Sequence, residues 1–303
     1  MSETRSTLEA CGPRKVGPGT ARSLIASLKS IGFRFRFGKA LYRRPSVAAP
    51  ARHPKNSFLW RSQAITSVTG SCRQERMNSQ SREQIARIVS QIQSEVATLP
   101  IKNAESLRSL RRRLSKQVAH ECPEIIVGIG FSLVGIPGFA YRFLAYEMIL
   151  THKGALGSLG PRDVQRLGRG LDNWGAVDTF ACYISGPAWR QGQLPDELIH
   201  RWASSKDRWQ RRAAVVSTVP LNNKARGGTG DSRRTLAVCE MVVRDRDDMV
   251  VKAVSWALRE LSKRYPELVR QFIAKHESEL APRVLREVRN KLSTGRKSGK
   301  ASQ

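Results

Sequence analysis

Two stretches of the sequence repeat one another at a spacing that is typical of paired helices. DRWQRRAAVVS (207–217) and DDMVVKAVSWALRE (247–260) superpose when Arg212 is laid on Lys252, an offset of 40 residues. Each stretch begins with an acidic residue, which favours a helix start, and continues with the apolar spacing of an amphipathic helix. Repeats of this length arise when pairs of helices stack, so the sequence predicts successive helical pairs.

The rest of the chain after residue 76 supports the same class of fold. Helical stretches of ordinary length are separated by short loops that are rich in Pro and Gly, and no stretch shows sustained period-two alternation. We therefore predict an all-α, HEAT-like helical repeat solenoid. EIIVGIGFSLVGIPGFAYRF (124–143) is apolar but interrupted by glycines and a proline. We interpret it as a buried turn between core helices and not as a membrane span.

The first 76 residues have a different composition. They contain fifteen Lys and Arg but only three acidic residues, and Pro and Gly break any long period. Such a segment cannot bury enough apolar area to offset its ordering cost. We predict a disordered basic arm over 1–76, a helical domain over 77–294 and a disordered tail over 295–303. The arm could bind phosphates, target an organelle, or have no role, since Met77 opens the helical part and could be the true start.

The charge of the chain points to a polyanionic partner. Lys and Arg total 53 against 25 Asp and Glu, which gives a net charge of +28 and a pI near 11.0. Each phosphate that a cation neutralises releases counterions, so nucleic acid is the expected partner. An anionic membrane surface is the alternative that we rank second. We expect a monomer in the cytoplasm, associated with the nucleoid.

Two local features bear on this partner. One predicted helix, AESLRSLRRRLSKQVA (104–119), carries a basic row that either grips a nucleic-acid backbone or is a solvated face. The row comprises Arg108, Arg112 and Lys116, flanked by Arg111 and Arg113. The loop GGTG (227–230) lacks the neighbouring strand and the GK[ST] of a phosphate-binding loop, so we interpret it as a flexible connection.

Cysteine and histidine give no support for a metal site. The five cysteines and five histidines are dispersed, without C-x-x-C, H-E-x-x-H or H-x₃-H spacing. Scattered single thiols indicate a reducing compartment and not a disulfide framework. We predict no metal and no cofactor.

A group of candidate functional residues lies in the second half of the chain. Trp174 and Asp178 stand four apart in LDNWGAVDTF (171–180), so a helix would place them on one face. A ring face and a carboxylate both stabilise positive charge. Arg212 and Trp256 lie on later helical pairs and could share a concave surface with them. Core packing of the tryptophans and a structural salt bridge of the arginine are the alternative explanation.

These residues resemble the HEAT-like DNA alkylation repair glycosylases of the AlkD type, over about residues 82–292. The matching motifs are NWGAVDTFA, RWQRRAAVV and KAVSWALREL followed by SKRYPELV. The resemblance implies that Asp178 is the catalytic aspartate, that Trp174 and Trp256 flank the lesion, and that Arg212 contacts DNA. Arg211 is the adjacent candidate for that arginine.

The resemblance also implies an activity. The family hydrolyses the N-glycosidic bond of alkylated, cationic purines such as 3-methyladenine and 7-methylguanine in double-stranded DNA, without a metal or cofactor and without an enclosing pocket. Gly175-Ala176 after the first tryptophan and the longer loop NNKARGGTGDS (222–232) depart from the family pattern and bear on substrate preference. Two other functions stay open: a non-catalytic repeat protein that binds damaged or branched DNA, and a protein scaffold that owes its charge mainly to residues 1–76.

Overall fold

The computed structural model describes residues 79–298, and the following concerns this part of the chain. It is helical throughout and contains no strand, so the predicted all-α repeat fold is confirmed. The predicted arm at 1–76 and the last residues of the predicted tail lie outside the described residues. None of the described helices is both long and apolar enough to span a membrane.

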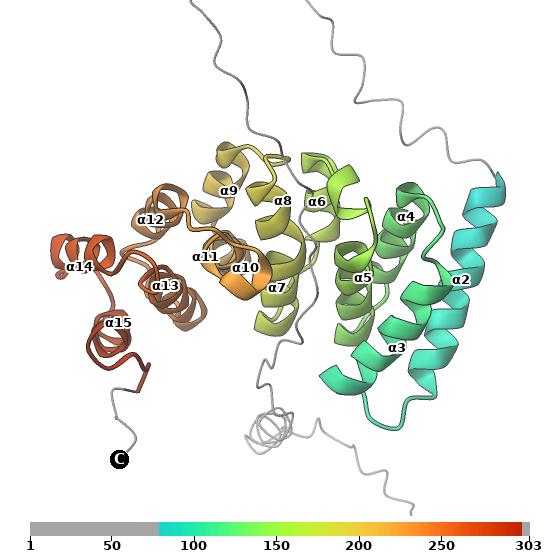
Figure 1. Ribbon diagram of the computed structural model, residues 1–303, viewed down its shortest axis with the longest axis horizontal. Coiled ribbons are helices and arrows are strands. Elements are labelled where there is room, and N and C mark those ends of the chain that lie inside the picture. The colour runs from blue at the N-terminus through green and yellow to red at the C-terminus, as the bar shows by residue number, and fades with distance from the viewer. Residues whose placement is uncertain (1–78, 299–303) are drawn as a thin grey trace, which may run out of the picture. The chain divides into compact units, whose positions relative to one another are not determined.

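The helices form two rows, in which each member contacts the next along much of the chain (Figure 1). The first row, which carries the candidate residues, consists of α3 (Ala104–Gln117), α5 (Phe139–Thr151), α7 (Trp174–Phe180), α10 (Arg208–Ser217), α13 (Asp248–Leu261) and α15 (Pro282–Thr294). The second row consists of α2 (Ser79–Ala97), α4 (Pro123–Val134), α6 (Pro161–Leu167), α9 (Asp196–Ala203), α12 (Ser232–Met241) and α14 (Pro266–Lys275). A continuous core of aliphatic and aromatic side chains fills the space between the rows.

Short segments complete the connections between these helices. They are η1 (Leu156–Ser158), η2 (Ala181–Ser185), α8 (Gly186–Arg190), α11 (Val219–Asn222) and η3 (Lys224–Arg226). Here η2 is a π-helical segment that joins α7 to α8, so that 174–190 is one helix with a widened turn in its middle. The helix that we expected to carry Trp174 and Asp178 is thus confirmed, and it extends to Arg190.

The interpretation of 124–143 as a buried turn was wrong for most of its length. Residues 123–134 form α4, α5 begins at 139, and the turn at 135–138 is largely exposed. Gly130, one of the glycines that suggested a turn, serves helix packing instead, because a Cβ on it would lie 2.6 Å from Cδ1 of Ile149 on α5. Tertiary contact between α4 and α5 therefore overrides the low helix propensity of glycine.

Residues 227–230, which we expected to form a flexible connection, are held by hydrogen bonds within the 222–232 loop. The amide of Gly228 donates to the carbonyl of Asn223 at 2.9 Å, and the amide of Gly230 donates to that of Leu221 at 3.0 Å. Gly228 has no room for a side chain, since a Cβ would lie 2.4 Å from the Pro220 carbonyl oxygen. The glycines thus allow a close approach of backbone to backbone.

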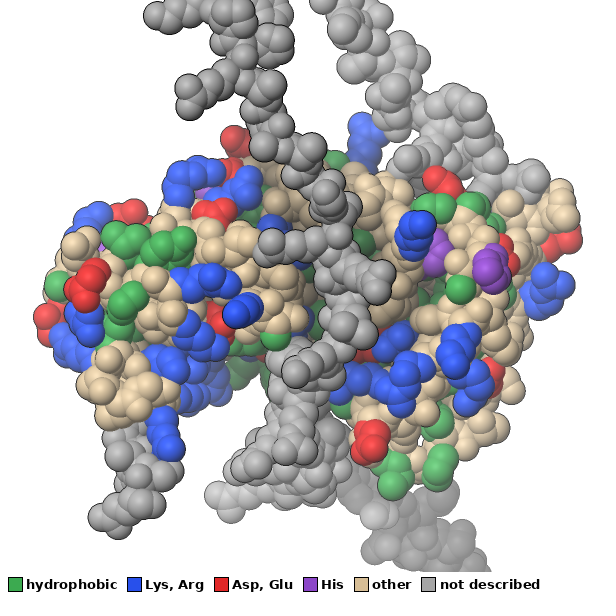
Figure 2. Space-filling view, in the orientation of Figure 1, with side chains coloured by type: hydrophobic (Ala, Val, Ile, Leu, Met, Phe, Trp, Pro, Cys, Tyr) green, Lys and Arg blue, Asp and Glu red, His purple; other side chains and the backbone are tan. Residues whose placement is uncertain are grey.

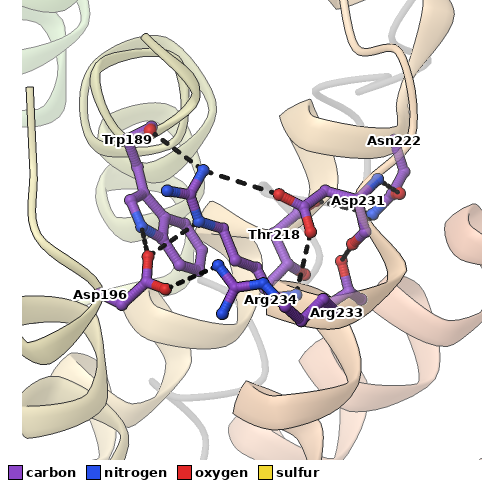
Figure 3. Close-up of polar contacts among 8 residues, drawn as sticks. Trp189, Asp196, Thr218, Asn222, Asp231, Arg233 and Arg234 are labelled. Atoms are coloured by element: carbon purple, nitrogen blue, oxygen red, sulfur yellow. Dashed lines mark hydrogen bonds and ion pairs between the residues drawn. The ribbon is translucent and has the colours of Figure 1, made fainter. Parts of the chain in front are cut away.

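A polar network ties α9 and α12 of the second row to α8, the last part of the 174–190 helix (Figure 3). The indole of Trp189, which is fully buried, donates to Asp196 at 2.8 Å. Arg234 donates to the same carboxylate at 2.8 Å and lies over the Trp189 ring, with Arg233 on the second carboxylate oxygen at 3.0 Å. Burial raises the pKa of Asp196, but the hydrogen bonds and the charge of Arg234 outweigh it and leave the pKa below its usual range.

This network predicts the effect of Asp196→Asn on stability. The amide cannot bind two guanidiniums as a carboxylate does, so we expect a loss of about 1–2 kcal/mol in the free energy of unfolding at neutral pH. Because the folded pKa of Asp196 is lowered, its contribution is present above the unfolded pKa and disappears as the pH falls through the folded value. Urea unfolding at several pH values measures both effects.

Glu277→Gln is the control for Asp196→Asn. Glu277 pairs with Arg289 where both side chains are more than half exposed, so its loss should change the unfolding free energy little. Asp196→Asn should lower the unfolding free energy less in strongly acid solution than at neutral pH. If the loss of unfolding free energy is the same at both pH values, the charge of the carboxylate does not have the role that we assign to it.

Candidate nucleic-acid interface

The N-terminus of α7 presents an aromatic side chain to solvent. Asn173 caps the helix, since its side-chain oxygen accepts a hydrogen bond from the amide of Ala176 at 3.0 Å. Asn at this position favours a helix start. Trp174 is the first helical residue, and 40% of its surface is exposed. This exposure distinguishes Trp174 from Trp189, which is fully buried.

One turn further along α7, Asp178 forms a two-point ion pair with Arg212 of α10. Nε of Arg212 donates to Oδ1 of Asp178 and Nη2 donates to Oδ2, both at 2.9 Å. The pair is almost sealed from water, with 8% of Asp178 and 5% of Arg212 exposed. Both charges are compensated, as buried charges need to be.

The third nitrogen of the same guanidinium reaches the next helix. Nη1 of Arg212 donates to the backbone carbonyl of Met249, in the first turn of α13. A single side chain therefore joins α7, α10 and α13, three consecutive helices of the first row. The position of the Asp178 carboxylate is fixed by contacts that come from two further helices.

The environment of Asp178 raises the pKa of its carboxylate above the usual value for an aspartate. Burial raises the pKa of Asp178, and the charge and hydrogen bonds of Arg212 oppose this increase without cancelling it; Arg226 acts in the same direction as Arg212. An ionised Asp178 is thus a destabilised anion that depends on its arginines.

The structure differs from the expected location of the arginines. We expected Arg212 to lie on a concave surface and to contact DNA, but Arg212 is buried and all three guanidinium nitrogens have partners inside the protein. Arg211, the adjacent candidate, donates to Asp245 at 2.6 Å and to the carbonyls of Ser205 and Lys206. Neither arginine presents its charge freely to solvent.

Trp256 lies on α13, seven residues after Met249 and so about two turns further along the helix. It is half-buried and packs against the core. The structure thus brings Asp178 and Arg212 together, places Trp174 one turn away, and puts Trp256 on a helix that Arg212 also contacts. A hollow of about 360 Å³ lies elsewhere, between α14 and α15, and none of these residues lines it.

The predicted basic row on α3 is divided by the fold. Arg108 and Arg111 face inward and pair with the buried Glu147 of α5, at 3.2 and 3.3 Å. Arg112 and Lys116 are exposed. Figure 2 shows Lys and Arg side chains gathered near α3 and again around α13 and α15.

Sequence reasoning missed a second polar group on the helix that carries Asp178. Tyr183 is buried, and the centre of its ring lies 5.0 Å from the guanidinium of Arg226. Arg226 belongs to the 222–232 loop, to which the sequence analysis assigned no site residue. The unusual length of this loop was the one sequence feature that could have indicated a role for it.

Among the described residues, no three His, Cys, Asp or Glu side chains are grouped so that they could hold a metal ion. The chemistry of the cluster is therefore that of a carboxylate, arginines and indoles. Such a set can stabilise positive charge at the carboxylate and the rings, and negative charge at the exposed cations.

The fold and these residues define an all-helical repeat protein with a basic surface and a buried carboxylate–guanidinium pair one helical turn from an exposed tryptophan. The family of DNA alkylation repair enzymes matches residues 74–292, which is most of the chain. The chain belongs to this family, and the match supports a role in DNA alkylation repair. A search of curated proteins gave no match.

The buried pair predicts an asymmetric response to substitution. Arg212→Met leaves the Asp178 carboxylate buried without its partner, so we expect the free energy of unfolding near pH 7 to fall by about 3–5 kcal/mol. The difference in unfolding free energy between Arg212→Met and the wild type should become smaller as the pH falls. A carboxylate whose pKa is raised in the folded state binds a proton more readily there, and the proton removes the uncompensated charge. Urea unfolding at pH 5 and pH 7 measures this.

Adding Asp178→Asn to Arg212→Met should restore part of the lost stability, because it removes the uncompensated charge. If the double variant is as unstable as the sum of the two single variants, the two side chains are not coupled as the hydrogen bonds indicate.

Proposed function

We propose that the protein is a monofunctional DNA glycosylase that removes cationic, alkylated purines such as 3-methyladenine and 7-methylguanine from double-stranded DNA. The observation that carries the proposal is the Asp178 carboxylate, which is held by Arg212 one helical turn from the exposed Trp174. In a member of the DNA alkylation repair enzyme family, that arrangement is suited to meet a positively charged nucleotide.

The proposed reaction needs little covalent help from the protein. The bond between C1′ of the sugar and the ring nitrogen breaks, and its electron pair neutralises the positive charge of the alkylated base. The sugar becomes oxocarbenium-like, and a water oxygen then bonds to C1′ and loses one proton. Asp178 stabilises the cationic sugar electrostatically or accepts that proton as a general base.

The surrounding residues have distinct roles in this proposal. Arg212 orients the carboxylate and keeps it ionised, and so acts through Asp178 and not on DNA directly. Trp174 contacts the lesion nucleotide through its exposed ring, with Trp256 as the second aromatic contact. Exposed cations such as Arg112 and Lys116 attract the phosphate backbone.

A second function is favoured by one specific observation. Asp178 is only 8% exposed and both its oxygens are bonded to Arg212, which is also how a purely structural ion pair looks. A non-catalytic protein that binds damaged or branched DNA would keep this pair and the basic surface. It would bind DNA with a steep salt dependence and release no base.

Substitution of Asp178 separates the two functions. The wild-type protein should release 3-methyladenine or 7-methylguanine from alkylated DNA, and Asp178→Asn should slow release about 100-fold or more while DNA affinity changes little. Chromatography of the released bases under single-turnover conditions measures the rate. Equal release by both proteins, or none by either, would reject the glycosylase.

Asp245→Asn is the matched control for Asp178→Asn. Asp245 is likewise a poorly exposed carboxylate bound by an arginine of α10, in this case Arg211. The two variants lose the same charge from comparable ion pairs. If base release needs the carboxylate at position 178 and not merely a buried ion pair on α10, Asp245→Asn should release bases at nearly the wild-type rate.

The exposed indole gives a further prediction. Trp174→Ala removes a ring that is proposed to face the cationic base, so we expect a roughly 2- to 30-fold loss in the preference for alkylated over unmodified DNA. Competition binding with the two DNAs measures that ratio. Met241→Ala, which removes another exposed apolar side chain, is the control, and an equal loss there would remove the specific role of Trp174.

A further inference from the structure

The helix that carries Trp174 and Asp178 changes its hydrogen-bond register one turn after Asp178. In η2 the amide of Gly186 donates to the carbonyl of Ala181, five residues back, instead of to that of Cys182. The cause lies in the next residue, because Pro187 has no N–H and cannot continue the helical pattern. Widened turns of this kind occur often at functional sites.

This change of register leaves the carbonyl of Cys182 without its usual donors. An α-helical bond to this oxygen would come from Gly186, whose N–H is used by Ala181, and a π-helical bond would come from Pro187, which has none. A buried carbonyl needs a partner. Nη1 of Arg226 supplies one, since it donates to the Cys182 oxygen at 3.3 Å.

Arg226 also contacts the side chain that follows Cys182. The guanidinium carbon lies 5.0 Å from the centre of the Tyr183 ring, within the range of a cation–π contact. Arg226 therefore contacts both the backbone and a side chain of η2. Its charge is also felt at Asp178, where it helps Arg212 to oppose the rise in the pKa of the carboxylate.

Two arginines from other parts of the fold hold the loop that carries Arg226. Arg190 of α8 donates to the carbonyls of Pro220 and Arg226, at 3.0 and 2.9 Å. Arg264, beyond α13, donates to the carbonyls of Asn222 and Gly228, at 2.9 and 2.7 Å. The loop is thus a fixed support for the Arg226 side chain.

The same region sets the spacing between α7 and α10. Ser185 and Ser217 share a hydrogen bond at 2.7 Å between their hydroxyls. A Cβ on Gly186 would lie 2.7 Å from the carbonyl oxygen of Ser217, so the backbones of η2–α8 and α10 approach closely here. Asp178 and Arg212, which lie on these two helices, meet on one side of this contact.

We propose that Arg226 is a positioning residue: by bonding the carbonyl that Pro187 leaves open, it fixes the register change in η2 and hence the direction in which α7 presents Asp178 and Trp174. The inference rests on the proposed glycosylase function for its effect on rate. The bracing itself is a property of the fold and can be measured without activity.

A simpler role for Arg226, as one more cation that attracts DNA, predicts different results. Loss of a phosphate contact weakens binding to all DNA sequences and reduces its salt dependence. Lys224 provides the matched control, because it is an exposed cation in the same loop, two residues away. Lys224→Ala removes the same charge without touching Cys182.

The test compares Arg226→Ala, Arg226→Gln and Lys224→Ala in single-turnover base release at saturating protein. Arg226→Ala should slow release about tenfold with little change in DNA affinity, since small displacements of a catalytic group are costly. Arg226→Gln keeps an N–H donor without the charge and should recover part of the rate. Lys224→Ala should lower affinity and leave the rate unchanged.

Pro187→Ala makes the test specific to the open carbonyl, because alanine restores an N–H at this position. The reduction in the rate of base release caused by Arg226→Ala should then be several-fold smaller when Pro187→Ala is also present. An equal loss in both backgrounds, or equal effects of Arg226→Ala and Lys224→Ala on affinity with no effect on rate, would overturn the proposal.

Hydrogen exchange separates this proposal from the proposed function. Arg226→Ala should speed amide exchange over residues 181–190 at least several-fold, and less so when Pro187→Ala is also present. If the wild-type protein releases no base, the glycosylase proposal fails. The dependence of the Arg226→Ala effect on Pro187 would still support the proposal that Arg226 fixes the hydrogen-bond register of η2. Exchange that is unaltered by Arg226→Ala overturns the bracing whatever the activity.

Discussion

The arrangement of the candidate interface depends on one buried guanidinium. Arg212, which belongs to α10, donates hydrogen bonds from two nitrogens to Asp178 of α7. Its third nitrogen donates to the carbonyl of Met249 at the start of α13. Helical repeats contact only their neighbours, so their relative positions are set locally. A three-point polar link across three successive helices therefore fixes the part of the first row that carries Trp174 and Asp178.

Such a link has an energetic cost that aliphatic packing would avoid. A buried ion pair must recover the desolvation of both charges, and apolar replacements of similar volume are often as stable. The raised pKa of Asp178 shows that the arginines do not fully offset burial. An anion held in this way is poorly solvated and in a fixed place, which are the properties that electrostatic stabilisation of a cation requires.

The sequence predicted the class of fold and the pairing of helices well, because apolar spacing and the offset between 207–217 and 247–260 are local signals. It placed Trp174 and Asp178 on one face for the same reason. It left open whether Arg212 contacts DNA or forms a structural salt bridge, and it could not identify Asp178 as the partner, because that depends on how α7 and α10 approach each other. α4 was missed because the glycine at position 130 is explained only by the closeness of α5.

The distribution of charge weighs against a scaffold whose basic character comes mainly from the N-terminal segment. Residues 1–76 hold fifteen of the 53 basic residues and three of the 25 acidic ones, so they carry +12 of the net +28 and the remainder carries +16. In that remainder, Arg212 is paired with the buried Asp178, whereas Arg108 and Arg111 share the single carboxylate of Glu147. The surplus of +16 therefore belongs to the part of the chain that contains the helical repeats, where a polyanion can meet its exposed cations.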